Sequence, residues 1–183
     1  MIKEYQGKSP GEIVGLRPAR QLYRAFGVDP TKTRPSSEAL LRRIVKQKPF
    51  PLISNAVDVC NLCALKFLLS LGLYDADKIQ GKVVLRKGEQ GESFAGIRKG
   101  QVNLAGRLVL ADDLGAFGNP SSDSLRTSVD EKTSALWMVI FAPQDYSRQL
   151  MQEHVATSTG LFERYLLRPG SSDSIGHDVR GGR

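Results

Sequence analysis

The chain has 183 residues, a mass of 20.1 kDa and a hydrophobic content of 40%, which suits one globular domain and excludes a chain that is disordered throughout. No apolar run approaches the length of a membrane span, and the opening stretch MIKEYQGKSPGE has no signal-peptide hydrophobic segment, so we expect a cytoplasmic protein without a membrane partner. The net charge of +7 favours a polyanionic partner such as RNA, although many basic proteins bind no nucleic acid.

Two amphipathic helices are predicted near the N-terminus. In residues 18–30, apolar side chains recur at helical spacing and Gly27 supplies a C-terminal stop signal. In residues 35–49, a proline opens the segment, Ser36 or Ser37 is the expected N-cap, and a second proline ends the helix.

The polar face of the second predicted helix is strongly basic. It carries Arg42, Arg43, Lys46 and Lys48. Solvation alone explains most faces of this kind, and contact with phosphate groups is the alternative. Arg42 and Arg43 are therefore candidate RNA-binding residues.

A largely buried third helix is predicted for residues 53–72, with Gly72 as its C-terminal stop. Cys60 and Cys63 fall inside its apolar pattern, in the sequence CNLC. The chain has two histidines, and neither lies at the spacing of a zinc finger. The two cysteines fall midway through the predicted helix, whereas a thioredoxin-type pair lies at the start of one. We expect two buried core thiols, with no bound metal or other cofactor.

A polar stripe runs along this third helix. Asn55, Asp58 and Asn61 follow one another at intervals of three residues. Buried polar groups need hydrogen-bond partners, so these side chains either fasten the helix to neighbouring backbone or face a cavity. We expect Asp58 to fasten the backbone and keep Asn61 as a candidate substrate-binding residue.

The middle of the chain is predicted to be β-rich and the end helical. In the middle, glycine-containing turns separate short runs of β-branched and aromatic residues. At the end, a proline precedes an apolar pattern with helical spacing, and Gly160 is the expected break in that helix. The order of elements indicates an α+β fold, with a central mixed or antiparallel sheet flanked by helices. The expected domain is 1–168, followed by a disordered tail at 169–183. The predicted strands are 82–86, 92–97, 107–112 and 134–143, and the last helix is 143–167.

The loop GNPSSDSLRT, residues 118–127, is rich in hydrogen-bonding side chains. Most such loops are solvated turns, and a pocket that reads a small polar ligand is the alternative. The chain has neither a GxSxG nor an HExxH motif. Residue types alone leave both interpretations of the loop open.

Five stretches in a fixed order carry a resemblance to a known family. Together they resemble the editing module of the phenylalanyl-tRNA synthetase β subunit, the paired B-three/B-four domain, over roughly residues 20–145. The stretches are NAVDVCN (55–61), YDADKIQG (74–81), LRKGEQGE (85–92), LVLADDLGAF (108–117) and SVDEKTSALWMVIFAP (128–143).

The resemblance implies an α+β module that hydrolyses the ester of a wrongly attached amino acid on a tRNA. By similarity, the chain looks like a freestanding trans-editing aminoacyl-tRNA deacylase whose partner is a mischarged tRNA, with a synthetase as a second candidate partner. A non-catalytic tRNA-binding module and a small amino-acid-binding protein of the same fold remain alternatives. The oligomeric state is left open.

Two positions depart from the family pattern. Gly72 stands where synthetase members have a histidine, and Asp123 falls nearest to the position of their glutamate. The apolar pocket loop of the family is replaced here by the hydroxyl-rich sequence FGNPSSDS. Because a site that hydrogen-bonds a substrate hydroxyl rejects analogues without it, we expect a polar amino acid as the substrate side chain.

The resemblance assigns candidate roles to residues in and around this loop. Asp123, Asn119 and Ser122 are the catalytic candidates: Asp123 anchors the α-ammonium group or orients water, and backbone N–H groups of the loop donate to the oxyanion. Structural roles compete with each assignment, including turn capping by Asp123, pairing of Arg126 with Asp112 or Asp113, and solvation of Glu92. The substrate-binding candidates are Ser121, Ser124, Thr127, Tyr74, Asn61 and Glu92, and the remaining RNA-binding candidates are Arg34, Arg86 and Arg126.

Overall fold

The computed structural model describes residues 2–166 and has an α+β architecture. The helices are α1 (Ile2–Tyr5), α2 (Arg17–Ala25), α3 (Ser36–Val45), α4 (Asn55–Phe67) and α5 (Arg148–Tyr165), with 3-10 turns at Val14–Leu16 and Ala76–Lys78. The strands are β1 (Ser70–Asp75), β2 (Val84–Lys87), β3 (Ser93–Ala95), β4 (Gln101–Asn103), β5 (Leu108–Asp112), β6 (Gly115–Asn119), β7 (Ser122–Asp123) and β8 (Leu136–Phe141). None of the helices in this part of the chain is long and apolar enough to span a membrane.

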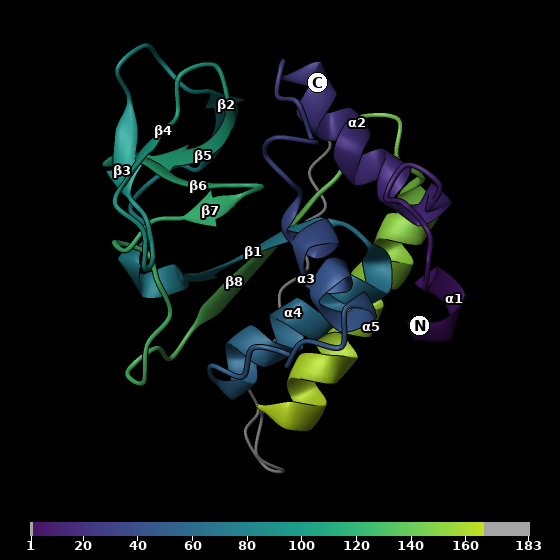
Figure 1. The fold of residues 1–183 in the computed structure, drawn as a ribbon. Helices are drawn as coiled ribbons and strands as arrows, with labels where there is room; N and C mark the ends of the chain where they lie inside the picture. The colour runs from purple at the N-terminus through teal and green to yellow at the C-terminus, as the bar shows by residue number, and fades with distance from the viewer. Residues whose placement is uncertain (1, 167–183) are drawn as a thin grey trace.

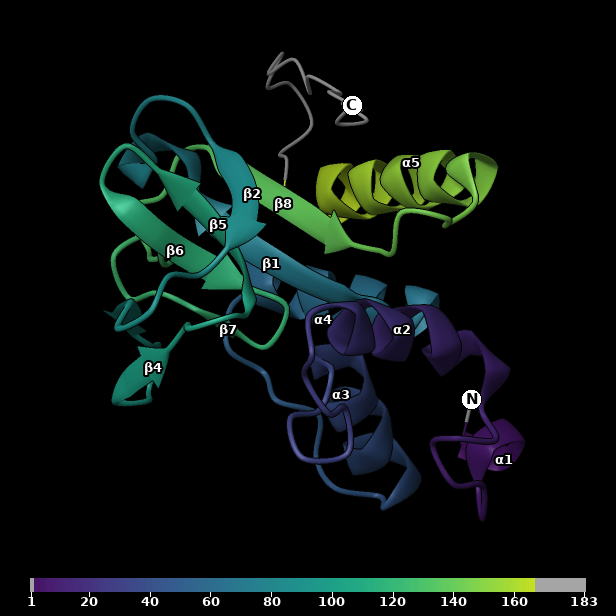
Figure 2. The same cartoon turned by 90° about the horizontal axis from the view of Figure 1, so that it is seen from above.

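The strands form three antiparallel sheets. These have the orders β1-β8, β2-β5-β6-β7 and β3-β4. The smaller strands β2–β7 gather on one side of the molecule and the helices on the other, and the β1-β8 ribbon runs from one part to the other (Figures 1 and 2). The expected central sheet is therefore divided, and its strands are paired in an antiparallel manner.

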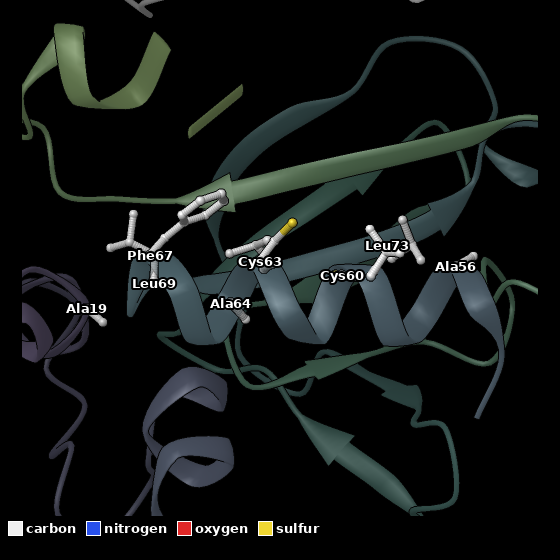
Figure 3. Close-up of a cluster of buried hydrophobic side chains, with 10 residues drawn as sticks. Ala19, Ala56, Cys60, Cys63, Ala64, Phe67, Leu69 and Leu73 are labelled. Atoms are coloured by element: carbon white, nitrogen blue, oxygen red, sulfur yellow. The ribbon is translucent and has the colours of Figure 1, made fainter. Parts of the chain in front are cut away.

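The main core lies where α4 packs on the β1-β8 ribbon and on α5. Cys63 points from α4 toward the strand above it (Figure 3), and both Cys60 and Cys63 are buried free thiols. Leu71 and Leu73 of β1 belong to the same cluster. The prediction of two core cysteines is confirmed, and burial raises the pKa of both thiols.

The predicted end of the third helix, at Gly72, is wrong. Helix α4 ends at Phe67, Leu68 takes the left-handed conformation with φ 56°, and Gly72 lies inside β1. All six residues of β1 are buried, so the strand lacks the polar alternation that distinguishes a half-buried strand from a buried helix. A left-handed leucine at the boundary gives no sequence signal, because glycine is the usual residue there.

Helix α3 begins without the predicted serine cap. Its N-cap is Pro35, and no side chain caps the first turn. Helix α2 begins after Leu16 and has Pro18 in its first turn, and Gly27 lies just beyond its end with φ 69°.

The C-terminal helix begins later than expected. Ser147 caps it through a hydrogen bond from Leu150 N, and Gly160 does not interrupt it. Three strands, β4, β6 and β7, occupy segments predicted as turns or loop. The expected tail at 169–183 lies outside the described residues.

Candidate functional site at the β6–β7 turn

The serine-rich loop forms a tight hairpin between β6 and β7. Asn119, at the end of β6, is buried, and its Oδ1 accepts hydrogen bonds from Ser121 N at 2.7 Å and from Ser122 N at 2.9 Å. This arrangement fixes the turn from within. It also means that these two N–H groups already donate to a side chain, so an oxyanion at the loop needs other donors.

Asp123 on β7 is held by Tyr74 on β1. The Tyr74 hydroxyl donates to Asp123 Oδ1 over 2.6 Å, and the tyrosine side chain is fully buried. Gly72 and Gly118 lie against the Tyr74 ring, and a Cβ atom on either would collide with the Tyr74 hydroxyl. Gly72 and Gly118 therefore make room for this tyrosine.

The environment of Asp123 favours its protonated form. Burial raises its pKa to about 7, while the Tyr74 hydrogen bond and the nearby Lys99 charge act in the opposite direction. Burial also raises the pKa of Tyr74, and the neighbouring carboxylate adds to that effect. A carboxyl group that titrates near neutral pH is suited to accepting and returning a proton.

Lys99 joins this group from the β3-β4 hairpin. Its Nζ donates to Ser122 Oγ at 2.9 Å and to Ser121 O at 3.4 Å. The hairpin is fixed against β7 because Ile97 N donates to Asp123 O at 3.2 Å. Sequence reasoning missed Lys99, because it lies 23 residues before Ser122 in the chain and no spacing connects the two.

Tyr23 of α2 is a second residue that sequence reasoning did not assign to the site. Its hydroxyl donates to Pro120 O at 2.8 Å and lies 2.8 Å from Ser121 Oγ. A shallow depression beside this contact is lined by Asn119, Ser121 and Arg107, among others. The predicted residues Asn119 and Ser121 therefore face α2, whereas Asp123 and Ser122 adjoin Tyr74 and Lys99.

Ser124 and Thr127 are buried in a local motif of their own. Their hydroxyl oxygens are 3.1 Å apart, and Thr127 N donates to Ser124 Oγ at 3.4 Å. The Thr127 carbonyl accepts from Asp75 N at 3.0 Å. These bonds give both side chains a role in joining the turn to the end of β1.

Two of the candidate arginines are paired with carboxylates. Arg86 forms two hydrogen bonds to Glu92, at 2.8 and 2.6 Å, and this contact lowers the pKa of Glu92 to about 2. Arg126 forms two hydrogen bonds to Asp112, at 3.0 and 2.8 Å. The structural alternative for Arg126 is confirmed, although the Asp112 side chain is buried and does not lie on the surface.

The remaining candidates lie on the helical part of the molecule. Asp58 accepts from Ile53 N at 2.9 Å, which confirms its role in fastening the backbone. Asn61 is half-buried on α4, and Arg34 is exposed before α3. Arg42 is half-buried and Arg43 exposed on α3, where Arg43 donates to Pro49 O at 3.1 Å.

Residues 2–166 contain no group of three or more histidine, cysteine, aspartate or glutamate side chains placed to hold a metal ion. His154 instead stacks on Phe67 with ring centroids 4.1 Å apart and hydrogen-bonds the Tyr146 hydroxyl at 2.8 Å.

Comparison with known proteins identifies the family. The family model described as B3/4 domain matches residues 18–165, which is most of the chain. The chain belongs to the B3/4 domain family. The match includes α2 to α5 and hence both sides of the β6–β7 turn.

Curated relatives of this B3/4 domain are phenylalanine–tRNA ligase beta subunits. The protein from Wolbachia sp. subsp. Brugia malayi is 29% identical over 125 residues, which cover 64% of this chain and 15% of the relative. That from Streptomyces avermitilis is 36% identical over 93 residues (50% and 11%), and that from Neisseria gonorrhoeae is 37% identical over 66 residues (36% and 8%). The matched part of this chain thus spans 15% or less of the length of these relatives.

Proposed function

We propose that this B3/4 domain is an aminoacyl-tRNA deacylase that acts in trans and hydrolyses the ester of a misacylated tRNA at Asp123. The observation that carries the proposal is a carboxyl group with a pKa of about 7, oriented by Tyr74 and adjoined by Lys99. The names of the relatives, phenylalanine–tRNA ligase beta subunits, support a tRNA substrate.

Asp123 acts as the general base in this proposal. The ionised carboxylate takes a proton from water while the water oxygen bonds to the ester carbonyl carbon. The tetrahedral intermediate then breaks its bond to the ribose oxygen, which receives the proton back from Asp123. The released amino acid loses its carboxyl proton to solvent, and the tRNA leaves with a free hydroxyl.

Lys99 and Ser122 supply the charge stabilisation. The N–H groups of Ser121 and Ser122 already donate to Asn119, so the oxyanion takes its donors from the Lys99 ammonium and the Ser122 hydroxyl. Those two groups lie 2.9 Å apart in the free protein. Tyr74 is a positioning residue, because it holds Oδ1 of Asp123 and leaves the other carboxyl oxygen for water.

The same residues favour a small polar substrate side chain. The Tyr74 ring fills the space between Gly72 and Gly118, so an aromatic side chain has no room there. The Ser122 hydroxyl and the Lys99 ammonium lie near Asp123, and such groups favour a substrate side chain that can form hydrogen bonds.

Single-turnover deacylation of a panel of mischarged tRNAs tests the proposal. The panel includes serine and tyrosine as the attached amino acids, together with correctly charged controls. We expect selective hydrolysis of a polar mischarged species and its loss in Asp123→Asn, with full activity in Glu131→Gln as an exposed carboxylate control. Hydrolysis by Asp123→Asn at the wild-type rate would show that the site is misplaced.

A non-catalytic tRNA-binding module is the second candidate. The first 50 residues contain 11 Lys and Arg residues against 4 Asp and Glu, so they carry the whole net charge of +7 and the remainder is neutral. A concentration of positive charge of this kind favours a phosphate backbone. Binding of uncharged tRNA that weakens steeply with salt, without hydrolysis of any species in the panel, identifies this function.

A further inference from the structure

A second cavity lies between the N-terminal segment and α3, away from the β6–β7 turn. It has a volume of about 310 Å³, within the range of roughly 300–1,000 Å³ that is typical of small-molecule sites. One wall comes from residues 5–16, which precede the start of the family match at residue 18. We call this cavity the α3 cleft.

The floor of the α3 cleft is apolar. Ile13, Leu16 and Leu41 are among its lining residues, and each is at least nine-tenths buried. Val45 lies beside them on α3. This floor suits a branched or aromatic hydrocarbon group, because the transfer of such a group out of water is favourable.

Three cations surround this floor. Lys8, Arg42 and Lys46 line the cleft, and none of their side chains has a hydrogen bond or ion pair with another residue in the part of the chain that the structure describes. Arg42 and Lys46 are four residues apart on α3, a spacing at which like charges repel each other. A carboxylate placed among them removes that repulsion and satisfies their donors.

Glu38 brings the opposite charge to the same cleft. It lines the cleft one helical turn before Arg42, and only 1% of its surface is exposed. Its Oε2 atom forms an ion pair with Arg20 Nε at 3.1 Å but accepts no hydrogen bond. A buried carboxylate needs donors, and an ammonium group supplies them.

We propose that the α3 cleft binds a free apolar α-amino acid. The carboxylate lies among Lys8, Arg42 and Lys46, the α-ammonium donates to Glu38, and the hydrocarbon side chain packs on the apolar floor. Glu38 and Arg42 are one turn apart on α3, about 5.4 Å along the helix axis, so both side chains adjoin the same part of the cleft. An RNA phosphate would pair with the cations but would leave the apolar floor uncovered, and it would donate no hydrogen bond to Glu38.

Calorimetric titration with L-leucine tests the proposal, and two analogues test its parts. 4-Methylpentanoate lacks the ammonium group and 3-methylbutylamine lacks the carboxylate, so each should bind roughly tenfold or more weakly than leucine. Arg42→Gln removes a cation and Val45→Trp fills the cleft, and we expect both to weaken leucine binding by roughly tenfold or more. Lys48→Gln is the matched control, because Lys48 is exposed and does not line the cleft.

Thermal unfolding of each variant first establishes that it is folded. Absence of leucine binding to the wild-type protein at millimolar concentration overturns the proposal. Binding that survives Arg42→Gln and Val45→Trp but is lost in Asp123→Asn overturns it as well, because the ligand then occupies the β6–β7 turn. Equal affinity for 4-methylpentanoate and leucine overturns the role of Glu38 and leaves a site for organic anions. None of these readings depends on tRNA hydrolysis, so failure of the deacylase proposal is detected separately.

Discussion

The hydrogen bond from Tyr74 to Asp123 joins two different sheets. Tyr74 lies on β1 of the two-stranded sheet, and Asp123 lies on β7 at the edge of the four-stranded sheet. A 2.6 Å contact between a buried phenol and a carboxyl that titrates near neutrality therefore connects the helical core to the candidate site. Stability and activity should both respond to changes in this pair.

Removal of the tyrosine hydroxyl tests the pair directly. Tyr74→Phe leaves Asp123 without its donor, and we expect a loss of about 1–3 kcal/mol in the free energy of unfolding. The hydrogen bond from Tyr74 lowers the pKa of Asp123, so its loss should move the pH profile of deacylation to higher pH. Urea unfolding and a pH–rate profile measure the two effects, and an unchanged profile would contradict the role of Tyr74 as a positioning residue.

The raised pKa of Asp123 predicts how stability depends on pH. The folded carboxyl has a pKa of about 7 against an ordinary value of 3.8, so the folded state holds this proton more tightly than the unfolded state. The contribution of Asp123 is therefore fully present at low pH and is lost as pH rises from about 4 to 7. Urea titrations across this range should show the free energy of unfolding of the wild-type protein falling as pH rises. The same pH dependence in Asp123→Asn would contradict the assignment of the raised pKa to Asp123. Deacylation should follow the opposite trend and rise through pH 7, as the carboxylate forms.

The two glycines beside Tyr74 should not tolerate a methyl group. In Gly72→Ala and Gly118→Ala, the new Cβ meets the Tyr74 hydroxyl, and we expect each to cost about 1–3 kcal/mol through overpacking. Gly100→Ala is the control, because no atom lies within 4 Å of the added Cβ there. Thermal or urea unfolding of the three variants gives the comparison, and equal stability of all three would show that the strands adjust at no cost.

Lys99 should influence both charge and substrate. Its positive charge lowers the pKa of Asp123, so Lys99→Met should raise that pKa and move the pH–rate profile to higher pH. We also expect deacylation to fall by roughly 10²-fold, the effect of removing one oxyanion donor in other enzymes. Lys87→Met, at an exposed position in β2, is the control. A lower affinity for tRNA with an unchanged hydrolysis step would make Lys99 a binding residue only.

The Arg126–Asp112 pair should matter for stability more than for RNA binding. The Asp112 side chain is fully buried, and it accepts hydrogen bonds from the Gln80 and Leu114 N–H groups in addition to the two from Arg126. Arg126→Met should therefore cost about 1–3 kcal/mol, because it removes two hydrogen bonds from a buried carboxylate that keeps its backbone donors. Unfolding measurements and tRNA titrations separate the two roles. A stable variant with weakened tRNA binding would restore Arg126 to the RNA-binding group.

The sequence predicted the elements whose pattern is periodic and bounded by glycine or proline. Residues 18–30 and 35–49 were placed on helices because their apolar spacing and stop signals agree. The end of α4 was missed because β1 is buried along its whole length, so a helix and a strand produce the same apolar run. Strands β6 and β7 were missed because glycine, asparagine and serine are poor strand formers that pairing with neighbouring strands overrides.

The candidate site was predicted in part. The resemblance placed Asp123 and Tyr74 in it, and the structure brings these two residues together. Lys99 and Tyr23 were missed, because each reaches the turn through tertiary contact from a distant segment. Glu92 was grouped with the site through the resemblance, but its carboxylate is occupied by Arg86.

The pairing of β1 with β8 brings together the two ends of the segment that carries most of the candidate site. Asp75 lies opposite Leu136 in this ribbon, and Ala76 N donates to Ala135 O at 2.9 Å just beyond it. Residues 76–135, which include β7 and the β3-β4 hairpin, therefore form one segment that leaves and rejoins the helical core at the same place. Leu108, Leu110 and Phe117 of this segment pack with Leu22, Tyr74 and Phe141 from the rest of the chain. Insertions that spare these contacts therefore leave the packing between the two parts intact.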